Sequence, residues 1–144
     1  MKTLISISNP DLRKMFFSAD AISQLKQFSE VDWIEEGKPF RSPDLAEIID
    51  QYDACITSWG SPKFTQEVLA QAKRLKFIGH AAGSVVAVVN EDIFNTGITV
   101  TNANKPLAKS TAEAAVAFIM AGAWGLQRYS GKLKEGRWSN NNRE

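Results

Sequence analysis

The chain has 144 residues, 44% of them hydrophobic, which suits one compact domain or one domain with an added arm. Seventeen basic residues are interleaved with 16 acidic ones for a formal net charge of +1, so the composition gives no sign of a nucleic-acid-binding surface. The longest apolar run, residues 114–126, is shorter than the roughly 20 residues that a membrane-spanning helix needs, and the N-terminal apolar run is too short for a signal peptide. We therefore expect a soluble, cytoplasmic protein.

Strand-like and helix-like segments alternate along the first hundred residues. Strands are predicted over residues 3–7, 32–35, 54–57, 75–79 and 98–102. Helices are predicted over residues 18–28, after a cap at Ser42, after Thr65, and in a short stretch between the last two strands. Because crossover helices join parallel strands, this alternation predicts a flavodoxin-like, doubly wound, five-stranded parallel sheet. Ligands of such sheets bind above the carboxyl ends of the strands.

The last third of the chain has a different pattern. One long helix is predicted from Thr111 to about Leu133, and its first half is apolar on every face. Such a helix must be surrounded, by another domain or by another subunit. The chain is thus predicted to divide into residues 1–104, which form the sheet domain, and residues 105–144.

Few residues of this sequence are suited to catalysis. It contains no GxGxxG, P-loop or CxxC motif, and no serine, histidine and aspartate set that could form a triad. His80 is the only histidine, which excludes a multi-histidine metal site, and no metal site is predicted. Two interpretations of His80 stay open, a hydrogen-bonded structural histidine and a ligand contact. Cys55 is the only cysteine, and its apolar neighbours predict a buried structural thiol in a reducing compartment.

Two turns of small residues follow the third and fourth predicted strands. They are Ser58–Ser61 and Ala81–Val85. Consecutive backbone N–H groups in a turn of small residues form a concavity that binds anions, and a carboxylate fits such a site well. The sequence therefore predicts a site for a carboxylate ligand at this edge of the sheet.

Residues 75–113, LKFIGHAAGSVVAVVNEDIFNTGITVTNANKPLAKSTAE, resemble the signature of the D-isomer-specific 2-hydroxyacid dehydrogenases, a family that includes phosphoglycerate dehydrogenase. The matching positions are Leu75, Lys76, Ile78, Val85, Gly97, Ile98, Val100, Asn102, Ala112 and Glu113. Residues 57–69 are similar to the loop and helix after the family's third strand, and residues 135–138, EGRW, resemble the Gly-Arg-Trp that closes the family's helix.

The resemblance implies that the two parts of the chain belong to domains with different functions. Residues 1–104 would form the substrate-binding (catalytic) domain, and residues 105–144 the crossover and first helix of an NAD(P)-binding domain. Such enzymes pass hydride between the nicotinamide of NAD or NADP and the 2-carbon of a 2-hydroxy or 2-keto acid. Relatives pair through the region of residues 111–133, so a homodimer is expected.

The resemblance also implies site residues. Backbone N–H groups of Gly83 and Ser84, with Val85 beside them, would hold the substrate carboxylate, and Trp59 and Gly60 would line the substrate site. Gly83 and Thr111 would contact the cofactor.

The family's GxGxxG loop and its catalytic arginine, glutamate and histidine come after Gly-Arg-Trp, whereas this chain ends at Glu144. No catalytic residue is therefore assigned within it. The chain is expected to be the N-terminal part of a dehydrogenase, inactive alone and without saturable binding of NADH. The alternative is a non-catalytic ligand-binding or interaction domain derived from the family, and the coding frame beyond codon 144 would distinguish the two.

Several positions depart from the family pattern. Val86 replaces an aspartate, Ala82 and Ser84 replace glycines, Trp59-Gly60 stands where phosphoglycerate dehydrogenases often carry Arg-Ser, and Leu107 replaces an asparagine. These changes remove partners for a phosphate and make the pocket more apolar. We expect a substrate other than 3-phosphoglycerate, such as an apolar 2-hydroxy or 2-keto acid. The alternative is that Trp59 only packs and that other residues select the substrate.

Overall fold

The computed structural model describes residues 1–137, so Trp138 of the expected Gly-Arg-Trp match lies outside the described residues. The described chain forms two compact units, Met1–Asn104 and a second unit that begins at Lys105. They are taken in turn.

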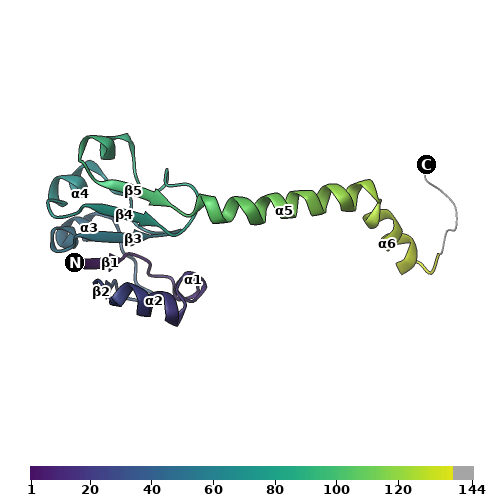
Figure 1. The fold of residues 1–144 in the computed structure, drawn as a ribbon, viewed down its shortest axis with the longest axis horizontal. Coiled ribbons are helices and arrows are strands. Elements are labelled where there is room, and N and C mark those ends of the chain that lie inside the picture. Colours follow the sequence, from purple (N-terminus) through teal and green to yellow (C-terminus); the bar gives the residue numbers. More distant parts are fainter. Residues whose placement is uncertain (138–144) are drawn as a thin grey trace. The chain divides into compact units, whose positions relative to one another are not determined.

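The first unit is built on a five-stranded parallel sheet with the order β2-β1-β3-β4-β5 (Figure 1). The strands are β1 (Lys2–Ile5), β2 (Glu30–Trp33), β3 (Ala54–Thr57), β4 (Phe77–His80) and β5 (Thr99–Asn102). This order is the flavodoxin-like one, which confirms the predicted fold. β3 has the predicted bounds, whereas the other strands differ from the prediction by one to two residues at one or both ends.

Helices connect the strands. They are α1 (Pro10–Phe16), α2 (Ala19–Lys26), α3 (Ser42–Ile48) and α4 (Gln66–Gln71), with short 3-10 helices η1 (Ile49–Gln51) and η2 (Glu91–Asn95). Thr65 caps α4 as predicted. The predicted cap at Ser42 is wrong: the cap residue is Arg41, whose N–H donates to the Asp44 carboxylate at 2.7 Å, while the Ser42 hydroxyl donates to the Lys63 carbonyl at 2.8 Å. Between β4 and β5 the only helix is the 3-10 helix η2, not a longer helical stretch.

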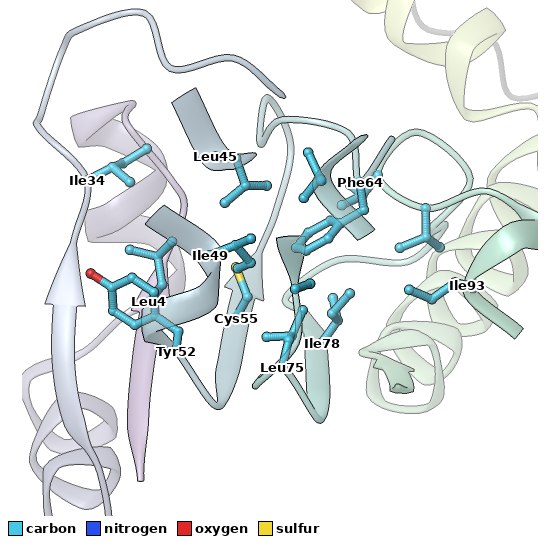
Figure 2. Packing of buried hydrophobic residues seen from close by; sticks show 14 residues of the cluster. Leu4, Ile34, Leu45, Ile49, Tyr52, Cys55, Phe64, Leu75, Ile78 and Ile93 are labelled. Carbon is cyan, nitrogen blue, oxygen red and sulfur yellow. The ribbon is translucent and has the colours of Figure 1, made fainter. Parts of the chain in front are cut away.

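The core lies between one face of the sheet and the helices that cover it (Figure 2). Leu4, Cys55 and Ile78 are register neighbours on β1, β3 and β4, so they share this face. Phe64 and Ile49 pack over them, and all five side chains are buried. Burial raises the pKa of the Cys55 thiol to about 12, so the thiolate nucleophile is absent at neutral pH, as the structural interpretation predicts.

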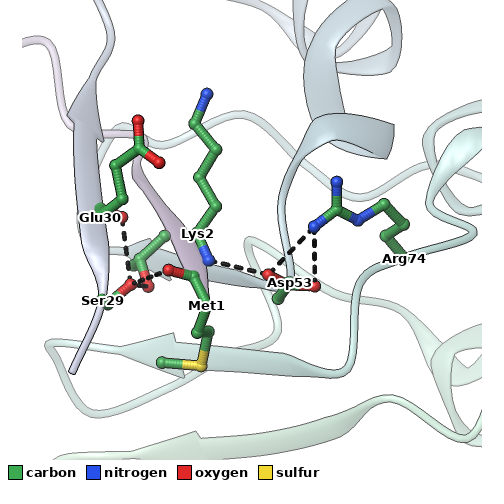
Figure 3. A network of polar contacts seen from close by, with 7 residues as sticks. Met1, Lys2, Ser29, Glu30, Asp53 and Arg74 are labelled. Atoms are coloured by element: carbon green, nitrogen blue, oxygen red, sulfur yellow. Dashed lines mark hydrogen bonds and ion pairs between the residues drawn. The ribbon is translucent and has the colours of Figure 1, made fainter.

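A polar network links the amino ends of neighbouring strands of the sheet (Figure 3). The Asp53 carboxylate accepts the Lys2 backbone N–H at 2.8 Å and the Arg74 guanidinium at 3.1 Å. Ser29 donates to the carbonyl of Met1, so the starts of β1, β2 and β3 are tied together. The amino ends of the strands are thereby fixed, which leaves the carboxyl ends as the open edge.

The second unit consists of two helices, α5 (Asn104–Ala123) and α6 (Leu126–Lys134). The predicted single helix from Thr111 to Leu133 is therefore wrong at both its start and its continuity. α5 begins earlier because the Asn102 side chain accepts the Asn104 N–H at 3.2 Å and Pro106 is tolerated in a first helical turn. The break before α6 comes at Gly125, which adopts a left-handed conformation with φ of 61°.

The apolar side chains of α5 are exposed in this structure. They include Val116, Phe118, Ile119 and Met120, and Trp124 just after the helix is exposed as well. Residues 1–137 alone therefore do not cover this helix, and its cover by another domain or subunit stays a prediction. Within residues 1–137, no helix has both the length and the apolar character that crossing a membrane requires.

Candidate functional site

The carboxyl ends of β1, β3 and β4 lie at one edge of the sheet, and the two turns predicted from the sequence follow directly from β3 and β4. In the strand order, β1 and β3 are neighbours whose connections lead toward β2 on one side and β4 on the other. This is the topological switch point of the sheet, where ligands bind in open α/β folds. The candidate site is therefore at this edge.

The first turn, Ser58–Ser61, is a tight and well-anchored β-turn. The Ser61 N–H donates to the Ser58 carbonyl at 3.1 Å, and Gly60 has a φ of 76°, as the third position of a type II turn requires. The Ser61 hydroxyl donates to the carbonyl of Ser6 at 2.7 Å and accepts the Ser58 N–H at 3.0 Å. The turn after β3 is thus fixed to the loop after β1, and Trp59 lies at its corner.

The second turn, residues 81–85, is anchored on both sides. The Ala81 N–H donates to the Thr57 carbonyl at 2.8 Å, and the Ala82 carbonyl accepts the Ala103 N–H at 2.9 Å. Within residues 1–137, the backbone N–H groups of Gly83, Ser84 and Val85 make no hydrogen bond. Ser84 is exposed and its two neighbours are half-buried, so these donors are open to a ligand. Successive unpaired N–H groups are what a bound carboxylate needs.

A buried hydrogen bond joins the strands that lead into the two turns. The His80 imidazole Nδ1 lies 2.9 Å from the Thr57 hydroxyl, and His80 is only 4% exposed. Loss of water on burial lowers the pKa of His80, so the neutral ring is favoured. This contact is what the structural interpretation of His80 predicts. Its other nitrogen, Nε2, has no hydrogen-bond partner in the described part of the chain.

The predicted substrate residues gather at this edge. Trp59 is 57% exposed and contacts the ring of Phe16 edge-on, with centroids 5.4 Å apart. Sequence reasoning missed Phe16, because its contact with Trp59 arises only in the folded chain. It placed Ser61 in the predicted turn but did not predict the hydrogen bond of Ser61 to Ser6. A hydrogen-bonding role of Ser61 could have been suspected from its place at the end of a turn of Ser-x-Gly-Ser type.

The predicted cofactor residues differ in what they offer. Gly83 presents a backbone with an unpaired N–H and no side chain, which suits close approach of a flat ring. Thr111 lies inside α5, where its hydroxyl donates to the Leu107 carbonyl at 3.0 Å. Thr111 is therefore helical as predicted, but it lies within α5 and not at its start, and Leu107 belongs to the same helix. Among the described residues no group of three or more histidine, cysteine or acidic side chains could hold a metal ion.

Residues 12–141 match the model of the family described as D-isomer specific 2-hydroxyacid dehydrogenase, catalytic domain. The chain is 31% identical to a D-3-phosphoglycerate dehydrogenase of Methanocaldococcus jannaschii over 83% of its length, and 29% identical to a glyoxylate reductase of Pyrococcus furiosus over the same share. It spans 22% of the first relative and 35% of the second.

Among solved structures, the PH0520 protein of Pyrococcus horikoshii OT3 superposes with a TM-score of 0.75 at 25% identity. That match covers 97% of this chain and 38% of the other. In each comparison, the matched region therefore covers most of this chain but less than half of the relative.

Proposed function

The chain belongs to the D-isomer-specific 2-hydroxyacid dehydrogenase family, and from this premise we propose that residues 1–104 form the substrate-binding half of such an enzyme. In this proposal, the turn after β4 holds the carboxylate of a 2-hydroxy or 2-keto acid. Residues 105–144 are the crossover and first helix of the cofactor-binding half.

The observation that carries the proposal is the set of unpaired N–H groups at Gly83, Ser84 and Val85. Each unpaired donor near the surface is satisfied by water until a carboxylate replaces it, and hydrogen bonds to a charged acceptor are worth about 1.5–3 kcal/mol. The anchors at Ala81 and Ala82 fix the turn before a ligand arrives, which lowers the entropy lost on binding.

The role of these residues in the reaction is to bind and orient the substrate. Members of the family depend on NAD or NADP, which when bound would supply hydride transfer at the 2-carbon of the substrate. Gly83 and Thr111 are the residues of this chain that would contact the cofactor. No GxGxxG motif is present in these 144 residues, so we expect this chain alone to show no saturable binding of NADH.

We assign an apolar 2-keto or 2-hydroxy acid as the substrate class. The support is local: Trp59 and Gly60 form the corner of the turn after β3, the strand next to the one that leads into the proposed carboxylate turn, and neither offers a positive charge to a phosphate. Two relatives are named D-3-phosphoglycerate dehydrogenase, so a phosphorylated substrate is the competing assignment. Saturable binding of 3-phosphoglycerate tighter than that of an apolar 2-keto acid would favour it.

We further propose that the segment of residues 111–133 mediates homodimer formation. The apolar side chains of Val116, Phe118 and Ile119 are exposed on a helix, and burial of such side chains stabilises association. A second copy would cover them.

The test of the carboxylate turn is the removal of one backbone donor. Ser84→Pro deletes the N–H at position 84, whereas Ser84→Ala keeps it and removes only the hydroxyl. Measured by NMR titration of the 144-residue chain with pyruvate, we expect Ser84→Pro to weaken the apparent Kd by about tenfold and Ser84→Ala to leave it within about twofold. Equal affinity of the two variants and the unmodified chain would refute the proposal, provided that both variants keep the spectrum of the folded chain.

A further inference from the structure

The Trp59 side chain, at the corner of the turn after β3, has one aromatic neighbour among the described residues. This is Phe16, the last residue of α1, whose ring meets the indole at 73° with centroids 5.4 Å apart. Trp59 is otherwise largely exposed, although a ring of its size is seldom left without cover. Its orientation therefore depends on the turn that carries it and on Phe16.

The backbone of this turn cannot adjust easily. Ser61 is hydrogen-bonded through both its N–H and its hydroxyl, and Gly60 uses a positive φ that other residues adopt only under strain. With the backbone fixed, the remaining freedom of Trp59 is rotation of its side chain. An edge-to-face partner restricts that rotation.

α1 is itself held firmly, so Phe16 is a fixed partner. Asn9 caps the helix, with its side chain accepting the N–H groups of Asp11 at 2.8 Å and Leu12 at 3.1 Å. Arg13 donates to the carbonyls of Ile7 and Ile34, which lie just after β1 and β2. The helix is thus capped at its start and tied at its middle to the segments that follow these two strands.

We infer that Phe16 is a positioning residue, which holds the Trp59 indole as an apolar wall of the substrate site and so favours 2-keto acids with a bulky apolar side chain. The inference rests on the proposed carboxylate turn. The inference adds to the proposed function that α1, through Phe16, takes part in selecting the substrate. The location supports it, since β1 and β3 flank the switch point of the sheet.

The adjacent residue, Phe17, provides a matched control. Its ring contacts Trp33 of β2, edge-on and 5.1 Å away, so it makes the same type of contact with a different tryptophan. Phe16→Ala and Phe17→Ala therefore make the same chemical change in neighbouring residues. Phe16→Leu keeps apolar volume without an aromatic ring, and serves if Phe16→Ala does not fold.

The first measurement reports the contact. In ¹H–¹⁵N spectra of the 144-residue chain, with indole signals assigned through Trp59→Phe and Trp33→Phe, Phe16→Ala should move the Trp59 signal and leave that of Trp33. Phe17→Ala should do the reverse. A Trp59 signal that does not respond to Phe16→Ala would overturn the inference.

The second measurement reports selectivity, by titration with pyruvate and with 4-methyl-2-oxopentanoate. The unmodified chain and Phe17→Ala should bind the branched acid about tenfold more tightly than pyruvate. Phe16→Ala and Phe16→Leu should reduce that preference below about threefold. Absence of any preference in the unmodified chain, or an unchanged preference in both Phe16 variants, would overturn the inference. If neither acid perturbs the amides of Gly83–Val85, it is the proposed function that fails.

Discussion

Thr57 and His80 are register partners at the carboxyl ends of β3 and β4, and a hydrogen bond of 2.9 Å joins the Thr57 hydroxyl to His80 Nδ1. The next residue after Thr57 opens the turn that carries Trp59, and the next after His80 opens the turn that carries Gly83. This buried contact therefore sets the spacing between the two halves of the candidate site.

The first prediction concerns the pH dependence of stability. Burial lowers the pKa of His80 in the folded chain, so the unfolded chain takes up a proton first as the pH falls. The stability that the neutral ring contributes is present above the unfolded pKa, near 6.5, and is lost as the pH falls toward the lowered value. Urea unfolding of the unmodified chain should thus weaken between about pH 7.5 and 5.5, a range above the titration of carboxylates.

His80→Gln is the control for this prediction, because it can keep a hydrogen bond to Thr57 but does not titrate. Its urea midpoint should change less over the same range. Equal changes in both proteins would show that His80 is not the group responsible.

The second prediction concerns Asp53. The Lys2 N–H, followed by the Arg74 guanidinium, holds the pKa of the Asp53 carboxyl below its usual range. The stability contributed is present above the unfolded pKa, near 3.9, and is lost as the pH falls through the lowered value. Asp53→Asn should therefore lower the urea midpoint at neutral pH, with the difference from the unmodified chain shrinking in acid. Arg74→Ala should cost less, because the Arg74 side chain is 55% exposed.

The third prediction compares two phenylalanines of the first unit. Phe64 is fully buried in the core, and Phe64→Ala should cost about 3–5 kcal/mol of unfolding free energy, through lost burial and a cavity. Phe94 is 82% exposed, so Phe94→Ala should change stability by less than about 0.5 kcal/mol. Denaturant unfolding followed by circular dichroism measures both. Similar costs at the two positions would contradict the described core.

The fourth prediction concerns association through α5. At micromolar concentration, gel filtration with light scattering should give the mass of a dimer, because in the proposed homodimer a second copy would cover the exposed apolar side chains of the helix. Phe118 is 76% exposed on α5, and Phe118→Asp should shift the mass toward the monomer. Phe94→Asp, a matched change in the first unit, should not. A clean monomer of the unmodified chain would refute the dimer.

The sequence was sufficient for the order and type of the first-unit strands, since each apolar run is bounded by polar or turn-forming residues. β3 was predicted to the residue because Asp53 and the turn at Ser58 limit it on both sides. The start of β4 was predicted two residues too early. Leu75 is apolar because it is buried, but it lies in the loop before the strand.

Other features depend on contacts that no local pattern records. The start of α5 depends on the Asn102 side chain, which accepts the Asn104 N–H, and Lys105-Pro106 resembled a loop in the sequence. Gly125 could have indicated the break between the helices, but the apolar pattern continues on both sides of it and predicts one uninterrupted helix. The small residues of the turn after β4 predict a carboxylate site, which stays a proposal, whereas the contact of Trp59 with Phe16 is seen only in the fold.

The central claim is that the Gly83–Val85 turn holds a carboxylate, and amide mapping of the 144-residue chain tests it most directly. Titration with pyruvate should move the ¹H–¹⁵N signals of Gly83, Ser84 and Val85 progressively to saturation, and the neutral analogue pyruvamide should leave them in place. Signals at these three positions that stay unchanged with pyruvate, or that respond equally to pyruvamide, would contradict the claim.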